Sequence, residues 1–220
     1  MKHRYTIAAV GGVLLLGAAA IAQTVTVPQV TVVHPTDLIQ VIPNGNPKFG
    51  NRCIYYSSSA SNDASGLLIS KADLIDMAGN WTIELFCYGQ LTNDTVLLRI
   101  ADDAVLNNSF TVYKTAGFPM SVNAFSTVDN SWSVGLNSGA YNHIAISKVG
   151  TTVRCFCNGV LALTMAGVNN TSKLDNIYLG YANLNNASYK NFTSLIDAFV
   201  VHNSLGLYTL PFTPRSSAPI

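Results

Sequence analysis

The carboxylates decide whether this chain could hydrolyse a glycosidic bond. Of its eleven acidic residues ten are aspartates, and Glu84 is the one glutamate. Glycoside hydrolysis needs two carboxyl groups about 5–9.5 Å apart, one protonated and one ionised. Glu84 lies in an alternating apolar and polar run, residues 81–88, where Thr82 and Phe86 share its face and offer no second carboxylate. We therefore expect no catalytic pair at Glu84.

Other kinds of catalytic site also find no support. The sequence has no G-x-S-x-G nucleophile motif and no H-E-x-x-H metal motif. His34, His143 and His202 stand far apart in the chain, and we interpret each as a polar surface residue. We predict that the protein is not an enzyme, and a glycoside hydrolase is the least favoured alternative.

The cysteines offer a choice between buried thiols and a disulfide. Cys155 and Cys157 are two residues apart, so in a strand they share one face, and Cys87 lies on the predicted core face of another run. Neighbours at i and i+2 are poorly placed to bond each other, and C-x-C is not a zinc-ligand spacing. We favour three buried thiols. A bridge from Cys87 to Cys155 or Cys157 is the alternative, and the state of Cys53 stays open.

Aromatic residues flank loops rich in Gly, Ser and Asn between positions 116 and 141. Aromatic faces beside amide side chains are suited to contacts with sugars or proteins, whereas the alternative is that some of these rings pack inside the fold. The candidate ligand-binding residues are Tyr113, Phe118, Phe125, Trp132 and Tyr141.

Composition excludes two classes of protein. Only 10% of the 220 residues are charged, 49% are hydrophobic, and the formal net charge is +1, whereas an ordinary soluble domain has about 25% charged residues. The chain has no basic patch for nucleic acid, and it is too hydrophobic to be intrinsically disordered.

The first 22 residues have the features of a targeting segment. A basic start at residues 2–4 precedes an almost wholly apolar run, residues 6–22, which ends in Ala20-Ile21-Ala22. This pattern predicts a signal peptide cleaved after Ala22 and a secreted or surface-displayed protein. The alternatives are a retained membrane anchor and a hydrophobic arm buried in an assembly, so a membrane contact is expected only if residues 6–22 are retained.

The remaining sequence predicts an all-β fold. Residues 23–47 form an extended arm rich in Thr, Val and Pro, and short β-type runs closed by Gly, Asn or Ser follow it. Asn158-Gly159 is a strong hairpin signal because both turn positions need a positive φ. Strands are predicted at 81–88, 95–100, 109–113, 143–148, 151–157, 160–164, 173–180 and 195–201. Many short strands without a helical stripe indicate a sandwich or jelly roll.

Several motifs in order give a resemblance to a known family. They are Lys48-Phe49-Gly50, Asn80-Trp81-Thr82-Ile83-Glu84, Tyr141-Asn142-His143-Ile144-Ala145, the hairpin at residues 153–160, the segment 192–197, and Leu207-Tyr208-Thr209-Leu210-Pro211-Phe212-Thr213-Pro214. The chain resembles the laminin-G-like branch of the concanavalin-A-like lectin/glucanase superfamily, of the kind found in bacterial surface proteins and phage tail or virion proteins. The resemblance implies a concanavalin-A-like jelly-roll sandwich of two antiparallel sheets over residues 48–220.

Calcium enters only through this resemblance, because it is the commonest ion of the superfamily. Asp94, Asp102, Asp103 and Asp129 lie in predicted loops and are candidate ligands, with carboxylate oxygens of the kind that Ca²⁺ prefers. The sequence has no calcium-loop signature, so we favour solvated loop residues and keep calcium as the alternative. No other cofactor is expected.

The favoured function is a non-catalytic, exported binding module that recognises a glycan or a protein surface in adhesion. The alternative is a structural or decoration subunit of a phage virion or surface assembly. In that case the Thr/Val arm, residues 23–34, would dock on a neighbouring copy by strand addition.

Overall fold

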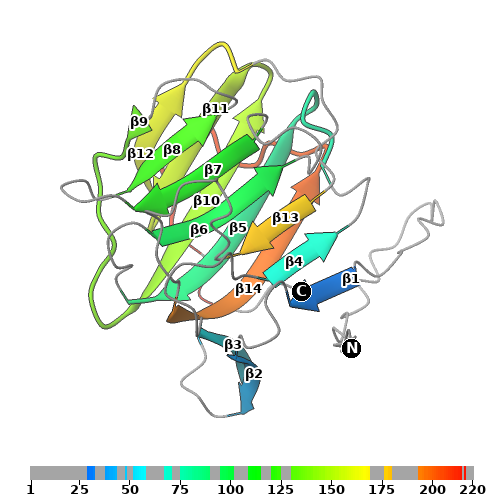
Figure 1. Cartoon of the computed structure of the whole chain (residues 1–220). Helices are drawn as coiled ribbons and strands as arrows, with labels where there is room; N and C mark the ends of the chain where they lie inside the picture. The colour runs from blue at the N-terminus through cyan, green and yellow to red at the C-terminus, as the bar shows by residue number, and fades with distance from the viewer. Residues whose placement is uncertain are drawn as a thin grey trace, which may run out of the picture.

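The protein is an antiparallel β-sandwich, which confirms the predicted fold class. The computed structural model describes residues 29–32, 38–43, 48, 52–57, 67–70, 75–89, 95–101, 109–114, 120–124, 130–168, 176–179, 193–214 and 216. Within these ranges all regular structure is β-strand, arranged in two layers (Figure 1). Each run predicted as a strand from position 81 onwards overlaps an observed strand.

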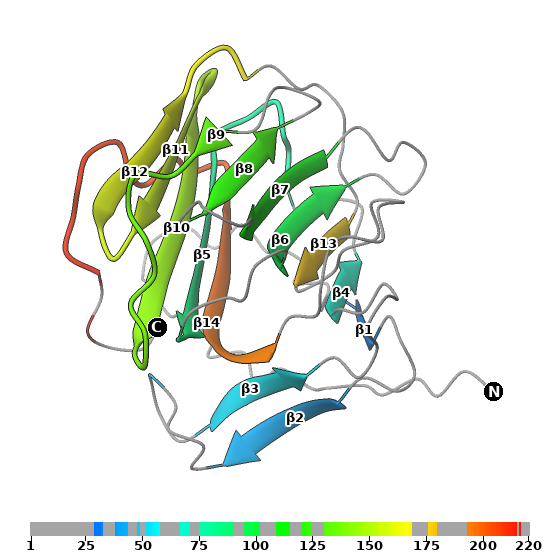
Figure 2. The same ribbon diagram turned by 60° about the vertical axis from the view of Figure 1, so that its left-hand side comes forward.

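Both sheets contain seven strands, and every pair of neighbours is antiparallel. The first sheet has the order β1 (Gln29–Val32), β4 (Leu67–Ser70), β13 (Asn176–Leu179), β6 (Thr95–Ala101), β7 (Ser109–Lys114), β8 (Ser121–Ala124) and β9 (Asn130–Ser131). The second has the order β12 (Val160–Met165), β11 (Thr152–Cys157), β10 (Tyr141–Val149), β5 (Trp81–Tyr88), β14 (Thr193–Asn203), β3 (Arg52–Ser57) and β2 (Leu38–Pro43). The two sheets face each other in Figure 2.

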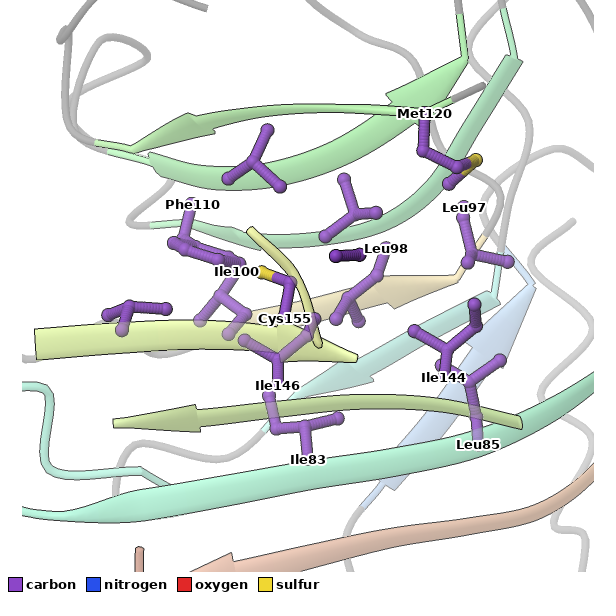
Figure 3. Close-up of a cluster of buried hydrophobic side chains, with 14 of the residues drawn as sticks. Ile83, Leu85, Leu97, Leu98, Ile100, Phe110, Met120, Ile144, Ile146 and Cys155 are labelled. Atoms are coloured by element: carbon purple, nitrogen blue, oxygen red, sulfur yellow. The ribbon is translucent and has the colours of Figure 1, made fainter. Parts of the chain in front are cut away.

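The hydrophobic core lies between the sheets. Along β5 the side chains of Ile83 and Leu85 point inward, and Ile144 and Ile146 do the same on β10. They meet Leu98, Ile100, Phe110 and other apolar side chains of the first sheet, as Figure 3 shows. Because successive strand residues face opposite sides, Thr82, Glu84 and Phe86 must point away from this core.

The two strands within residues 23–47, β1 and β2, each form one edge of a sheet. β1 pairs with β4 in the first sheet and β2 pairs with β3 in the second. In this structure β1 therefore pairs with its own chain, and docking of the arm on a neighbouring copy stays a prediction. Residues 6–22 lie outside the described residues. Among the described residues no helix has the length and hydropathy to cross a membrane.

The cysteines of β5 and β11 are core residues. Cys87, Cys155 and Cys157 are free thiols with no exposed surface, which confirms the favoured prediction for these three. Burial is the main cause that raises the pKa of Cys87 to about 12, with a smaller contribution from Cys157. Burial also raises the pKa of Cys157 to about 11 and that of Cys155 further. The side chain of Cys53 lies outside the described residues.

These three thiols should resist alkylation in the folded protein. Only the thiolate reacts, and a thiol with a pKa of about 11 is ionised in about one molecule in a thousand at pH 8. We expect mass spectrometry after iodoacetamide treatment at pH 8 to find Cys87, Cys155 and Cys157 unmodified in native protein and modified in guanidinium. Labelling of these residues at equal rates in both states would contradict the core placement.

Candidate functional site

The densest cluster of chemically active side chains surrounds Glu84 on the outer face of the second sheet. The Glu84 side chain is 2% exposed, and its two oxygens receive three hydrogen bonds. His143 Nε2 lies 2.9 Å from Oε2, His202 Nε2 lies 3.0 Å from Oε1, and the Tyr208 hydroxyl donates to Oε2 at 3.0 Å. Since a carboxylate only accepts, both imidazoles are assigned as donors through Nε2. We call these four residues the Glu84 cluster.

A β-bulge in β14 brings His202 into this cluster. The pairing of β14 with β5 shifts by one residue between Asp197 and Val200. Ala198, inside the bulge, has a φ of 49°, in the left-handed region that a residue with a Cβ rarely adopts. After the shift Val200 lies opposite Glu84, and His202 turns to the same face of the sheet.

Residues 204–214 cover this face, and we call them the C-terminal strap. In Figure 2 this red segment runs along the side of the second sheet that is turned away from the first sheet. The Thr82 hydroxyl donates to Leu205 O at 3.0 Å and accepts from Leu207 N–H at 2.9 Å. Ser147 Oγ accepts from Tyr208 N–H at 3.2 Å. The strap therefore uses outer-face side chains as partners for its backbone.

The far end of the strap packs against aromatic rings and a glycine. The rings of Tyr208 and Phe212 are stacked 3.8 Å apart, and Phe212 meets His143 edge-on at 5.6 Å. Phe212 N–H donates to Gly159 O at 3.0 Å. A Cβ on Gly159 would lie 1.8 Å from Phe212 O, and its φ is 79°. Only glycine fits this hairpin position, because both the close approach and the backbone conformation exclude a side chain.

The Glu84 cluster is suited to fastening the strap rather than to acid–base catalysis. Its carboxylate already has three donors, from His143, His202 and Tyr208. Nor does any group of three or more His, Cys, Asp or Glu in the described part of the chain have the arrangement to hold a metal ion. The prediction that His143 is a surface residue is wrong: it is 1% exposed, because the strap covers it.

The end of the sandwich where β5 finishes and β10 begins carries a different kind of site. Tyr88 and Tyr141 lie opposite each other across the two strands, both half-buried, with ring centroids 5.2 Å apart in an edge-to-face arrangement. Beside them runs the loop at residues 131–140, in which most residues are exposed. We call Tyr88, Gly89, Tyr141 and this loop the rim.

A buried amide holds the rim in place. Asn142 is fully buried, and its Nδ2 donates to Gly89 O at 3.2 Å, Asn137 O at 3.0 Å and Ala140 O at 3.3 Å. Its Oδ1 accepts from Asn137 N–H at 2.7 Å and from Asn158 Nδ2 at 3.0 Å. One side chain thus satisfies the inward-facing backbone of the loop, which is why an irregular segment can keep a defined shape.

The rim is also sterically open. A Cβ placed on Gly89 or Gly139 would meet no atom within 4 Å. Both glycines have a positive φ, 76° and 70° respectively, so they turn the backbone and leave no side chain above it. Asn137 and Ser138, both exposed, directly precede Gly139 on the loop.

The predicted aromatic residues fall in different places. Tyr141 lies on the rim, whereas Tyr113 and Trp132 are each 2% exposed, which corrects the expectation of exposed rings for these two. Trp132 packs into the hydrophobic core. Phe118 and Phe125 lie outside the described residues. Sequence reasoning missed Tyr88, although its position opposite Tyr141 follows from the alternation of β5 once the pairing is known.

The predicted calcium ligands Asp94, Asp102, Asp103 and Asp129 lie outside the described residues, so calcium stays a prediction.

Lys148 binds the turn that precedes β5 through two backbone carbonyl oxygens. Lys148 Nζ donates to Ala78 O at 3.1 Å and Gly79 O at 2.9 Å. Burial lowers the pKa of Lys148, and Asp76 opposes this shift.

Comparison with known proteins supports the fold. No protein-family model matches the chain, and no curated protein matches its sequence. The cellulose-induced protein Cip1 shares the fold with a TM-score of 0.58 at 12% identity, over 77% of this chain and 86% of Cip1. The binding domain of botulinum neurotoxin DC in complex with SialylT gives a TM-score of 0.54 at 12% identity, over 79% of this chain and 42% of that one. The neurotoxin serotype D binding domain gives 0.50 at 13% identity, over 78% and 44% respectively.

This chain therefore spans less than half of either toxin chain. At such low identities the likeness shows a jelly-roll β-sandwich, and it does not select the laminin-G-like branch.

Replacing Glu84 should weaken the strap. In Glu84→Gln the side chain presents an NH₂ group to donors, so we expect the free energy of unfolding to fall by about 2–3 kcal/mol. Tyr208→Phe removes one donor and should cost about 1 kcal/mol. Urea denaturation of both variants measures these changes, and unchanged stability in Glu84→Gln would refute the role of the carboxylate.

The bulge should tolerate glycine better than alanine. Because Ala198 has a positive φ, we expect Ala198→Gly to raise the unfolding free energy by about 0.5–1 kcal/mol. Ala145, paired in regular register on both sides of β10, is the control, because Ala145→Gly should lower stability in an ordinary strand. Thermal denaturation compares the pair, and destabilisation by Ala198→Gly would contradict the bulge geometry.

Proposed function

We propose that this protein is a non-catalytic, glycan-binding β-sandwich of the laminin-G-like kind, exported and displayed for adhesion. The observation that carries the proposal is the rim, where a half-exposed tyrosine pair adjoins an open loop fixed by Asn142. Predicted export supports the proposal, because a signal-like segment at residues 6–22 precedes the sandwich.

The chemistry of the rim suits sugar binding. Aromatic rings supply a rigid apolar surface, and neighbouring amide and hydroxyl groups supply directional hydrogen bonds. Tyr88 and Tyr141 provide the rings, while Asn137 and Ser138 provide the exposed polar groups. Since Asn142 already fixes the loop, a ligand would not need to order it on binding, which reduces the entropic cost of association.

The structural comparisons also support a binding role. A sandwich of this fold forms part of the neurotoxin binding domain that was solved in complex with SialylT. The three donors that hold the buried Glu84 carboxylate favour a structural role for this residue over hydrolysis.

A second candidate is a subunit of a virion or surface assembly. The observation in its favour is that β1 and β2 are both edge strands, so unpaired backbone groups border the N-terminal arm. Size-exclusion chromatography separates the two candidates. Oligomers that disappear on deletion of residues 23–36, together with no glycan binding, would favour assembly, whereas a monomer that binds glycans would exclude it.

Truncating the rim tyrosines should weaken glycan binding. We expect Tyr141→Ala, and separately Tyr88→Ala, to weaken binding to glycan-array hits about tenfold or more, because each removes ring surface from the contact. The matched control is Thr164→Ala, an exposed position on β12 away from the rim. Titration calorimetry gives the affinities, and equal affinity in all variants would reject the rim as the site.

A further inference from the structure

We propose that the rim selects uncharged glycans over sialylated or uronic-acid glycans. This inference rests on the proposed function and names the class of ligand at the same site.

The segments that meet at the rim contain no charged side chain. Residues 86–89, 130–142 and 155–160 include no Asp, Glu, Lys or Arg. The pairing of β5 with β10 and of β10 with β11 brings these three segments together at one end of the second sheet. The described residues that form the rim and its hairpin neighbour are therefore neutral.

The exposed groups of the rim match a neutral sugar. The backbone groups of Asn137 and Ala140 are occupied, since Asn142 binds both backbone groups of Asn137 and the Ala140 carbonyl also accepts from Gly89 N–H at 2.8 Å. The exposed residues Asn137 and Ser138 add a neutral amide and a neutral hydroxyl to the loop beside the rings. Sugar hydroxyls can pair with such groups without a counter-charge.

The charges nearest to the rim disfavour an anionic ligand. Asp197 lies opposite Phe86 on the face that carries Tyr88, and the Glu84 carboxylate lies on the same face. Of the cations on this face, Lys48 has its Nζ 5.6 Å from the centre of the Phe86 ring. Arg154 lies opposite Ser147, six residue pairs along β10 from Tyr141. Recognition of a sugar carboxylate normally uses a positioned Arg or Lys, because a desolvated anion without such a partner is costly. The described part of the rim has no such residue.

The test compares matched glycans that differ only in charge. The protein would be titrated with neutral oligosaccharides and with the same oligosaccharides carrying a terminal sialic acid or uronic acid, at about 50 and 500 mM salt. Tyr141→Ala tests dependence on the rim. Lys48→Met and Arg154→Gln test two cations on the outer face of the second sheet, and Thr164→Ala is the control at an unrelated exposed position.

We expect the neutral member of each pair to bind at least about tenfold more tightly. Its affinity should be insensitive to salt, lowered by Tyr141→Ala, and unchanged in Lys48→Met and Arg154→Gln. Tighter binding of the charged member that weakens in salt or in either cation variant would overturn the inference while leaving the glycan-binding proposal intact. If no glycan binds, or if Tyr141→Ala has no effect on the glycans that do, the rim proposal and this inference both fail.

Discussion

The outer face of the second sheet depends on one buried carboxylate. Taking Glu84 out of water is costly unless hydrogen bonds replace its hydration. Its partners come from β10, from β14 after the bulge, and from the C-terminal strap. The strained φ at Ala198 and the close approach at Gly159 are both consequences of assembling these donors around one side chain. The cluster thus joins three parts of the chain that are distant in sequence.

The same face contains two arrangements with different properties. Under the strap Thr82, Glu84 and Ser147 are hydrogen-bonded to strap residues, which stabilises a closed surface. At the rim, two residue pairs beyond Phe86 and His143, the tyrosines are half-buried and the neighbouring glycines face open space. In both places an inward-facing polar side chain organises an irregular segment: Glu84 holds the strap and Asn142 holds the rim loop. Irregular segments need such partners because they lack the hydrogen bonds of a sheet.

Part of the site followed from local patterns, and part did not. The alternation in residues 81–88 placed Glu84 on the face opposite the core, and the region around Tyr141 was a predicted contact surface. Tyr113 and Trp132 have the same local surroundings of Gly, Ser and Asn, yet both are buried. Burial depends on what packs over a residue, and neighbours in sequence do not show this. His202 was missed because a bulge shifts the alternation of β14 by one residue.

By itself the sequence determined the all-β class, most strand positions, the Asn158-Gly159 hairpin and the inward-facing cysteines, because each depends on period-2 patterning or on turn residues that act locally. Only the tertiary structure decided which strands are neighbours, that the strap crosses the outer face, and that Glu84, His143, His202 and Tyr208 meet. These outcomes depend on strand register and on contacts between residues more than fifty positions apart. The local sequence pattern does not show which residues pair, because the free energy that selects these pairings comes from burial in the assembled sandwich.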